Sequence, residues 1–288
     1  MGAGVVLETQ LIRGLATGWL RAGPERPDEN LPVLFFIHGF PDDAESWQEQ
    51  IAYFSTRFLI LAPFLRGSGP SLPGSDRRRF SLSAVALDHL EILRAESVRL
   101  GASRRVVVIG HDIGGIHAVE LAHLLGPRLI GLTLINAPSL EQMARRILRP
   151  KQVAKSWYIG VFLLPRVAER WFGPGKSGAV RAARRKGGLA ADLPLPTSVA
   201  PLLEHYRAFF RALPSVLRAR RKHLNAPVLV IAGKDDAFLE VPTESELARF
   251  AEHAEIRVLD GNHWLQLDHA TQVNRMIEKF LCSVGGAS

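Results

Sequence analysis

The sequence predicts an α/β protein with a mostly parallel central sheet flanked by helices and with an inserted helical cap. Two observations predict this fold class. Short apolar runs alternate with stretches of helical spacing in both end portions of the chain, as in strands buried on both faces of a parallel sheet. Between residues 138 and 222 that rhythm stops, and prolines and glycines separate helix-like segments. We therefore expect a core domain over residues 1–137 and 223–288 and a helical cap over residues 138–222.

The elements before the cap follow from apolar patterning. The first two strands form a hairpin pair, and the later runs, such as Pro-Val-Leu-Phe-Phe-Ile at residues 32–37, have no polar alternation and are expected to be buried. The predicted strands are residues 5–12, 17–21, 32–37, 59–62, 105–109 and 129–135. A helix is predicted over residues 83–100, with Ser81 or Ser83 as its cap, and another over residues 114–125.

The same alternation resumes after the cap. The run at residues 227–231 predicts a buried strand, and residues 256–259 predict the next one. A helix is expected between them, over residues 244–253, and a final helix after His269. This order keeps the sheet mostly parallel.

The most informative motif is Gly-His-Asp-Ile-Gly-Gly at residues 110–115, directly after a predicted strand. Small residues around a central side chain are typical of a sharp strand-to-helix turn that presents a nucleophile, and Asp112 occupies its apex. A carboxylate that attacks an electrophilic carbon forms an alkyl ester, which suits the opening of an epoxide or the displacement of a halide. The simpler alternative is that Asp112 only caps the following helix.

Two later loops could complete a catalytic set with this carboxylate. His263 lies on a loop after a predicted strand and is the candidate general base, because the chain then has the order nucleophile, acid, histidine. Asp236 is the candidate for the acid that orients the imidazole. The neighbouring Asp235 is an alternative acid, and both residues could instead only shape a turn.

Four more residues are candidates for oxyanion and ring-oxygen contacts. The backbone N–H groups of Phe40, in a His-Gly-Phe-Pro loop, and of Ile113 are predicted to form an oxyanion hole. Tyr158 and Tyr206 lie in the predicted cap, and a phenol can donate a proton to an epoxide oxygen as the ring opens. Each tyrosine could instead be an amphipathic core residue.

Taken together, these motifs resemble the α/β-hydrolase-fold epoxide hydrolases, which are related to haloalkane dehalogenases, over nearly the whole chain. The matching segments are residues 38–41, 46–47, 65–69, 110–115, 157–165 and 205–207, with Gln50, Asp236 and His263. The resemblance implies an α/β-hydrolase fold and hydrolysis of an epoxide to a vicinal diol through an ester on Asp112, with Tyr158 and Tyr206 as ring-opening acids. The aromatic content of the cap, including Trp157 and Phe162, suggests a small hydrophobic epoxide, and we expect Trp47 in the same pocket.

One departure from the family pattern bears on the alternatives. Ile113 stands where many relatives have a tryptophan, which the similar haloalkane dehalogenases use to hold halide. A haloalkane dehalogenase is therefore the second hypothesis, with Trp47 or Trp157 as the halide donor. A non-catalytic, ligand-binding member of the fold is the third.

Composition and charge limit the partners. The chain has no apolar run of about eighteen residues, no basic segment typical of a secretion signal, and a single cysteine, Cys282. We expect a cytoplasmic enzyme, a monomer or a homodimer, without metal or cofactor. The net charge of +8 comes largely from basic clusters at residues 77–79, 184–186 and 218–222. No nucleic-acid-binding module accompanies them, so we interpret them as solvated surface, and weak peripheral contact with a membrane stays open.

Overall fold

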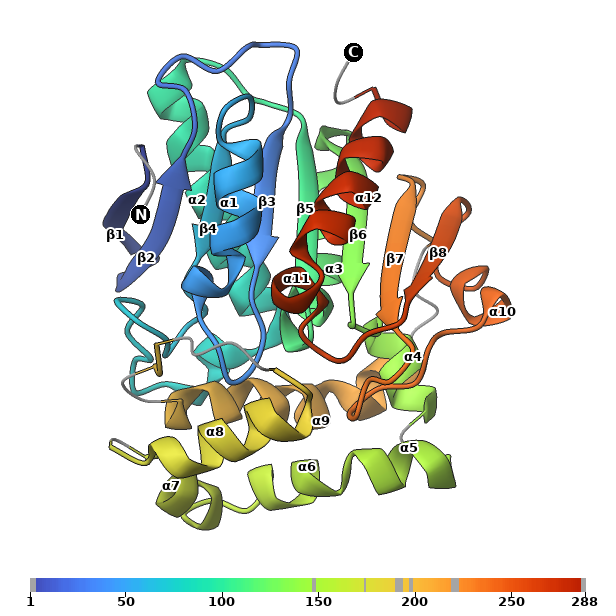
Figure 1. The fold of residues 1–288 in the computed structure, drawn as a ribbon. Coiled ribbons are helices and arrows are strands. Elements are labelled where there is room, and N and C mark those ends of the chain that lie inside the picture. Colours follow the sequence, from blue (N-terminus) through green and yellow to red (C-terminus); the bar gives the residue numbers. More distant parts are fainter. Residues whose placement is uncertain are drawn as a thin grey trace.

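The computed structural model describes residues 4–146, 149–173, 175–189, 194–196, 199–218 and 223–285. Its centre is an eight-stranded sheet with the order β1-β2-β4-β3-β5-β6-β7-β8 (Figure 1). The strands are β1 (Val6–Ile12), β2 (Leu15–Ala22), β3 (Val33–Ile37), β4 (Ile60–Pro63), β5 (Val106–His111), β6 (Leu129–Ile135), β7 (Val228–Gly233) and β8 (Ala254–Leu259). The pairs from β4 to β8 are parallel, and β2 is antiparallel to both of its neighbours. The predicted fold class is confirmed.

The central strands, which have unbroken apolar sequences, are covered on both faces, as expected. On β3, Phe35 packs in one core cluster while Leu34 and Phe36 pack in the other. The first cluster includes residues of α2 (Leu82–Leu100) and α3 (Ile113–Leu125), and the second includes residues of α1 (Gln48–Phe54) and α12 (Ala270–Ser283). Helices therefore cover the two faces of one sheet, as Figure 1 shows.

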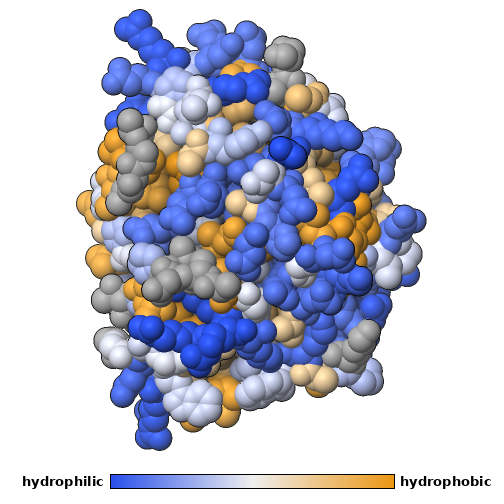
Figure 2. All heavy atoms as spheres, viewed as in Figure 1, coloured by the Kyte–Doolittle hydropathy of each residue, from blue (hydrophilic) through white to orange (hydrophobic). Residues whose placement is uncertain are grey.

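The helices of residues 138–222 lie across one end of the strands, below the carboxyl ends of the parallel strands in Figure 1. They are α4 (Leu140–Arg146), α5 (Pro150–Lys155), α6 (Trp157–Phe162), α7 (Val167–Phe172), α8 (Ser177–Lys186) and α9 (Leu203–Arg218). The predicted end of the cap at residue 222 falls outside the described residues, as does most of the basic cluster at 218–222. On the face drawn in Figure 2, strongly hydrophilic residues lie over α8.

A buried ion pair ties α8 to the loop after β3. The Arg184 guanidinium donates to the Asp42 carboxylate at 2.7 Å, and both side chains are almost fully buried. The Trp264 indole N–H donates to the other oxygen of Asp42. Asp42 therefore joins three segments. The interpretation of Arg184 as solvated surface is wrong, because its guanidinium is buried against Asp42, which lies 142 residues away in the chain.

The helix predicted over residues 244–253 is also wrong in extent, because α10 (Glu244–Leu247) ends early. Its start is fixed by a capping box between Thr243 and Glu246. The chain then leaves the helical path because Ala251 pairs with Leu224 in an isolated parallel bridge. A second short helix, α11 (Leu265–Asp268), was not predicted.

None of the helices in the described ranges combines the length and the apolar character needed to cross a bilayer.

Candidate active site

Asp112 occupies a sharp turn between β5 and α3. Its backbone has φ 50° and ψ −128°, a strained combination for a residue with a side chain. The turn also needs glycine at 114, because a Cβ atom there would lie 2.2 Å from the carbonyl oxygen of His38. The Asp112 side chain makes no capping hydrogen bond to α3. The capping alternative therefore does not describe this side chain, which is presented away from the helix.

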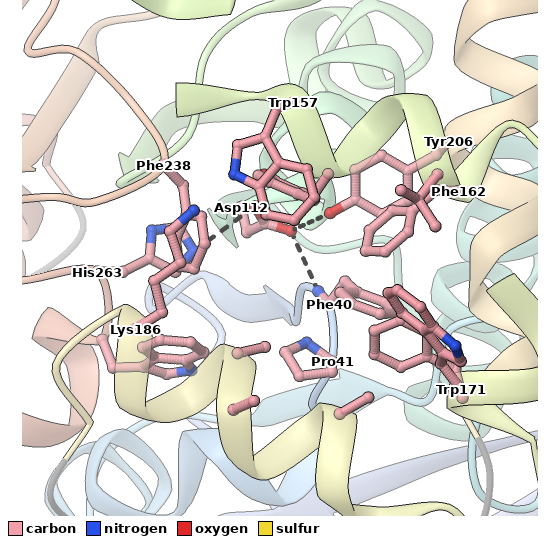
Figure 3. Close-up of a pocket in the computed structure, with 17 residues that line it drawn as sticks. Phe40, Pro41, Asp112, Trp157, Phe162, Trp171, Lys186, Tyr206, Phe238 and His263 are labelled. Atoms are coloured by element: carbon pink, nitrogen blue, oxygen red, sulfur yellow. Dashed lines mark hydrogen bonds and ion pairs between the residues drawn. The ribbon is translucent and has the colours of Figure 1, made fainter. Parts of the chain in front are cut away.

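The two oxygens of the Asp112 carboxylate have different surroundings. Oδ1 accepts a hydrogen bond from the backbone N–H of Phe40 at 3.1 Å and one from the Tyr206 hydroxyl at 3.2 Å (Figure 3). The backbone N–H of Ile113 makes a smaller contribution to lowering the pKa of the carboxylate. Oδ2 lies 3.5 Å from Nε2 of His263. One oxygen is thus held by hydrogen-bond donors, while the other faces the imidazole.

His263 is oriented from its other side by Asp236. Nδ1 of His263 lies 2.8 Å from Oδ2 of Asp236, and both side chains are buried. The second Asp236 oxygen accepts from the backbone N–H groups of Phe238 and Leu239 at 2.7 and 3.0 Å, which fixes the carboxylate. Asp235 is exposed to solvent. Of the two candidate acids, the structure brings Asp236 and not Asp235 to the imidazole.

The charges of this set are strongly coupled. Burial alone would raise the pKa of Asp112, but the hydrogen bond and charge of His263 hold it below its ordinary value. Burial alone would lower the pKa of His263, but the carboxylates of Asp236 and Asp112 outweigh it and raise the pKa to about 10. Near neutral pH the resting site therefore holds an imidazolium between two carboxylates. Burial, followed by the charge of Asp112, keeps the pKa of the Tyr206 hydroxyl far above its ordinary value, so that it remains a proton donor.

These side chains lie at the inner end of a cavity of about 230 Å³. The other lining residues come mainly from the helices over the sheet edge (Figure 3). They are Phe40, Pro41, Trp157, Tyr158, Val161, Phe162, Trp171, Phe172, Ala179, Ala182, Ala183, Lys186, Phe238 and Trp264. Tyr158 is half-buried between the rings of Phe162 and Phe238, and its hydroxyl has no hydrogen bond with any described residue.

Of the three predicted pocket residues, Trp157 and Phe162 line the cavity and Trp47 does not. Trp47 is fully buried against Phe36 and His111, in the core cluster on the α1 and α12 face of the sheet. Its placement in the pocket is therefore corrected. The motif around Trp47 indicates its place after the loop that follows β3. It does not indicate which face of the sheet the indole covers.

Sequence reasoning missed several lining residues, of which Lys186 is the most unusual. Its Nζ lies 5.5, 5.5 and 5.2 Å from the ring centroids of Trp157, Tyr158 and Phe238. These distances fit cation–π contacts. Lys186 belongs to a basic run that resembles ordinary surface, and no pattern in the sequence separates it from its neighbours.

His205 was also passed over, yet it anchors the start of α9. Its Nδ1 lies 2.9 Å from Nε2 of His117 on α3, and its Nε2 lies 2.9 Å from the carbonyl oxygen of Arg66. Burial lowers the pKa of His205 to about 4, so the ring is neutral and can share these bonds. The ring next to Tyr206 in sequence is thereby fixed to the helix that begins at the Asp112 turn.

Among the described residues, no group of three or more histidine, cysteine, aspartate or glutamate side chains could hold a metal ion.

Comparison with known proteins places this chain in a family. Residues 34–276 match the Alpha/beta hydrolase family. The chain belongs to that family. Epoxide hydrolase 3 of Xenopus tropicalis is 30% identical over 275 residues, which make up 88% of this chain and 72% of that protein. Epoxide hydrolase 4 of Mus musculus is 28% identical over 288 residues, covering 93% of this chain and 77% of its own. The predicted membership of the epoxide hydrolase group is confirmed.

A solved structure shares the fold of this alpha/beta hydrolase. The crystal structure of a mutant of an epoxide hydrolase from Bacillus megaterium superposes with a TM-score of 0.78, covering 95% of this chain and 99% of that one, at 21% identity. At this identity the likeness shows the fold alone.

The coupled charges generate a testable prediction. Asp112→Asn should lower the pKa of His263 below the value of about 10 in the parent protein, because one of its two carboxylate partners is lost. The stabilisation from this raised pKa is complete below the ordinary value of 6.5 and is lost as the pH rises through about 10, so the variant should lose less stability over that range. Histidine NMR titration and unfolding against pH measure both effects. The exposed Asp235→Asn is the matched control, and an unchanged His263 pKa in Asp112→Asn would contradict the coupling.

Proposed function

We propose that this protein hydrolyses epoxides to vicinal diols through a covalent ester on Asp112. One observation carries the proposal: a carboxylate at the elbow has a phenol donor, Tyr206, at 3.2 Å and an imidazole, His263, at 3.5 Å. This set provides a nucleophile, an acid for the ring oxygen and a base for water within one cavity. The names of the relatives reported above support the same reaction class.

In the first step, Oδ2 of Asp112 attacks an epoxide carbon, and the bond between that carbon and the ring oxygen breaks. Tyr206, with Tyr158 across the cavity, donates a proton to the leaving oxygen. Oδ1 then becomes the carbonyl oxygen of the ester and keeps its contact with the Phe40 N–H. The negative charge that Asp112 loses on forming the ester passes to the tyrosine that gave up its proton, and this tyrosine regains a proton from His263.

That proton transfer is favoured because ester formation removes the charge of Asp112. His263 then has one carboxylate partner, Asp236, and its pKa falls. The neutral imidazole can accept a proton from water, whose oxygen attacks the ester carbon. The oxyanion forms on Oδ1, where the N–H groups of Phe40 and Ile113 stabilise it. Collapse breaks the bond between Cγ of Asp112 and Oδ2, so that Oδ2 leaves as an oxygen of the diol and takes the second proton of the water. Asp112 and His263 return to their charged forms.

The helices over the sheet edge suit a hydrophobic substrate. We propose that residues 138–222 act as a cap that sets substrate size, because Trp157, Phe162 and Phe172 supply much of the cavity wall. Apart from Lys186 and the tryptophan indoles, the polar side chains at this cavity belong to the catalytic set or to the tyrosines. This arrangement favours an apolar epoxide.

The two other hypotheses have less support. A haloalkane dehalogenase needs N–H donors for halide beside the nucleophile. Of the two candidate donors, the Trp47 indole is buried in the core away from the cavity, which leaves Trp157 alone in the cavity wall. A non-catalytic role would leave the strained backbone of Asp112 and the buried Asp236–His263 pair without a purpose. Epoxide hydrolysis uses every one of these features.

The covalent intermediate can be trapped. In His263→Gln, ester formation should continue while hydrolysis slows by about 10²- to 10⁴-fold, because the base is missing. Intact-protein mass spectrometry after mixing with styrene oxide should then show one adduct, which peptide mapping places on Asp112. The double variant with Asp112→Asn is the control and should show none. An adduct on another residue, or none on a folded His263→Gln protein, would contradict the proposal.

The roles of the two cavity tyrosines can be tested one at a time, and the third tyrosine of the chain provides a control. Tyr206→Phe should slow single-turnover ring opening by about 10²- to 10⁴-fold, since it removes the donor at the nucleophile. Tyr158→Phe should slow it as well, and the double variant should nearly abolish it. Tyr53→Phe alters a phenol on the protein surface, bonded to Glu278, and serves as the control. Ring opening at the parent rate in the double variant would remove both tyrosines from the mechanism.

A further inference from the structure

The net charge of this protein is concentrated in one segment. Residues 150–186, which contain α5 to α8, hold nine of the 36 lysines and arginines but one of the 28 aspartates and glutamates. The rest of the chain is neutral, with 27 residues of each sign. The segment therefore carries a charge equal to the whole net charge of +8. Of the three clusters interpreted as solvated surface, the one at residues 184–186 belongs to this basic segment.

The same segment exposes large apolar side chains. They are Val153, Trp157, Leu164, Val167 and Trp171, with exposed fractions from 40 to 61%. The contrast among the five tryptophans is sharp: Trp157 and Trp171 are 61 and 54% exposed, whereas the other three are at most 1% exposed. Tryptophan is typical of the boundary between water and lipid, where its ring meets apolar chains and its N–H meets polar groups.

Exposed cations lie on two of the same helices. Arg170 precedes Trp171 on α7, and Arg181 and Arg185 lie on the neighbouring helix α8, all three with exposed side chains. None of them forms an ion pair with a described residue. Figure 2 shows strongly hydrophilic residues over α8 close to hydrophobic ones. Apolar side chains set among unpaired cations are the pattern of a surface that binds anionic lipid.

The mouth of the cavity opens on this surface. Trp157, Trp171 and Lys186 line the cavity and are also exposed, so they join the interior wall to the outside. We propose that the outer face of α5–α8, here called the cap face, docks on an anionic lipid bilayer and that apolar substrates enter the cavity from the lipid. Lipid is favoured over nucleic acid because Val153, Leu164 and Val167 can insert between acyl chains but offer nothing to phosphates or stacked bases.

Docking does not depend on the proposed chemistry, so it is tested by binding alone. The full-length protein is mixed with vesicles of phosphatidylcholine, or of phosphatidylcholine with phosphatidylserine, and sedimented at low and high salt. Binding is expected to the anionic vesicles, weakening with salt because exposed charges are screened. Tryptophan emission should shift to the blue, because the two exposed indoles leave water while the other three are already buried.

Matched charge reversals locate the surface. The triple variant Arg170→Glu, Arg181→Glu, Arg185→Glu should bind anionic vesicles on the order of 100-fold more weakly, given the contribution of each cation near such a surface. The control reverses three exposed cations of the core domain, Arg26→Glu, Arg275→Glu and Lys279→Glu, and so has the same net charge. It should keep most of its affinity.

Three results would overturn the proposal. One is no binding to anionic vesicles at low salt. Another is equal weakening in the two triple variants, which would mean that net charge alone matters. The third is binding of the parent protein to a duplex oligonucleotide but not to vesicles, lost in the cap-face variant, which would assign this face to nucleic acid.

Discussion

The site depends on holding one carboxylate in a position that a polypeptide backbone resists. Asp112 has a positive φ, and the turn around it leaves no room for a side chain at Gly114. The surrounding fold maintains this turn, since β5 and α3 on either side of it are buried within the core. As a result, the two carboxylate oxygens of the nucleophile have different environments. One accepts hydrogen bonds, and the other faces an imidazole. Every later step of the proposed chemistry uses this difference between the two oxygens.

The segments that complete the site are tied to this turn by buried polar contacts. His205 bonds to His117 on the helix after Asp112, and so fixes the start of the helix that carries Tyr206. Asp42 binds both Arg184 and Trp264, which joins the loop after β3 to α8 and to the loop of His263. Because an unpaired buried charge is costly, by about 3 to 5 kcal/mol, such contacts favour one relative arrangement of cap helices and core.

Much of the fold could be predicted because its signals are local. An apolar run as short as residues 33–37 is typical of a strand covered on both faces, and the glycines around Asp112 are typical of a sharp turn. The short α10 could not be predicted, since the bridge between Leu224 and Ala251 that ends it joins distant parts of the chain. Residues 244–253 taken alone suit a longer helix.

The site was predictable to the extent that its residues follow strand ends. Asp236 and His263 do so, and the structure brings His263 to Asp112 and Asp236 to His263. Trp47 shows the limit, because its position in a loop did not say which face of the sheet its ring would cover. Arg184 and Lys186 show it again, because they lie two positions apart on one helix and differ in environment. Arg184 is buried against Asp42, whereas Lys186 is exposed over three aromatic rings. Their partners come from other elements, which composition cannot reveal.

The central claim, that an Asp112 oxygen bonds to substrate carbon, is tested most directly by isotope transfer. Excess enzyme in oxygen-18 water is given a limiting amount of a hydrophobic epoxide, so that each molecule turns over once. The account predicts a first diol without label, because its new oxygen comes from the protein, and a label retained in the Asp112 carboxylate. A labelled diol from that single turnover would mean that water attacks the epoxide directly, and the account would be wrong.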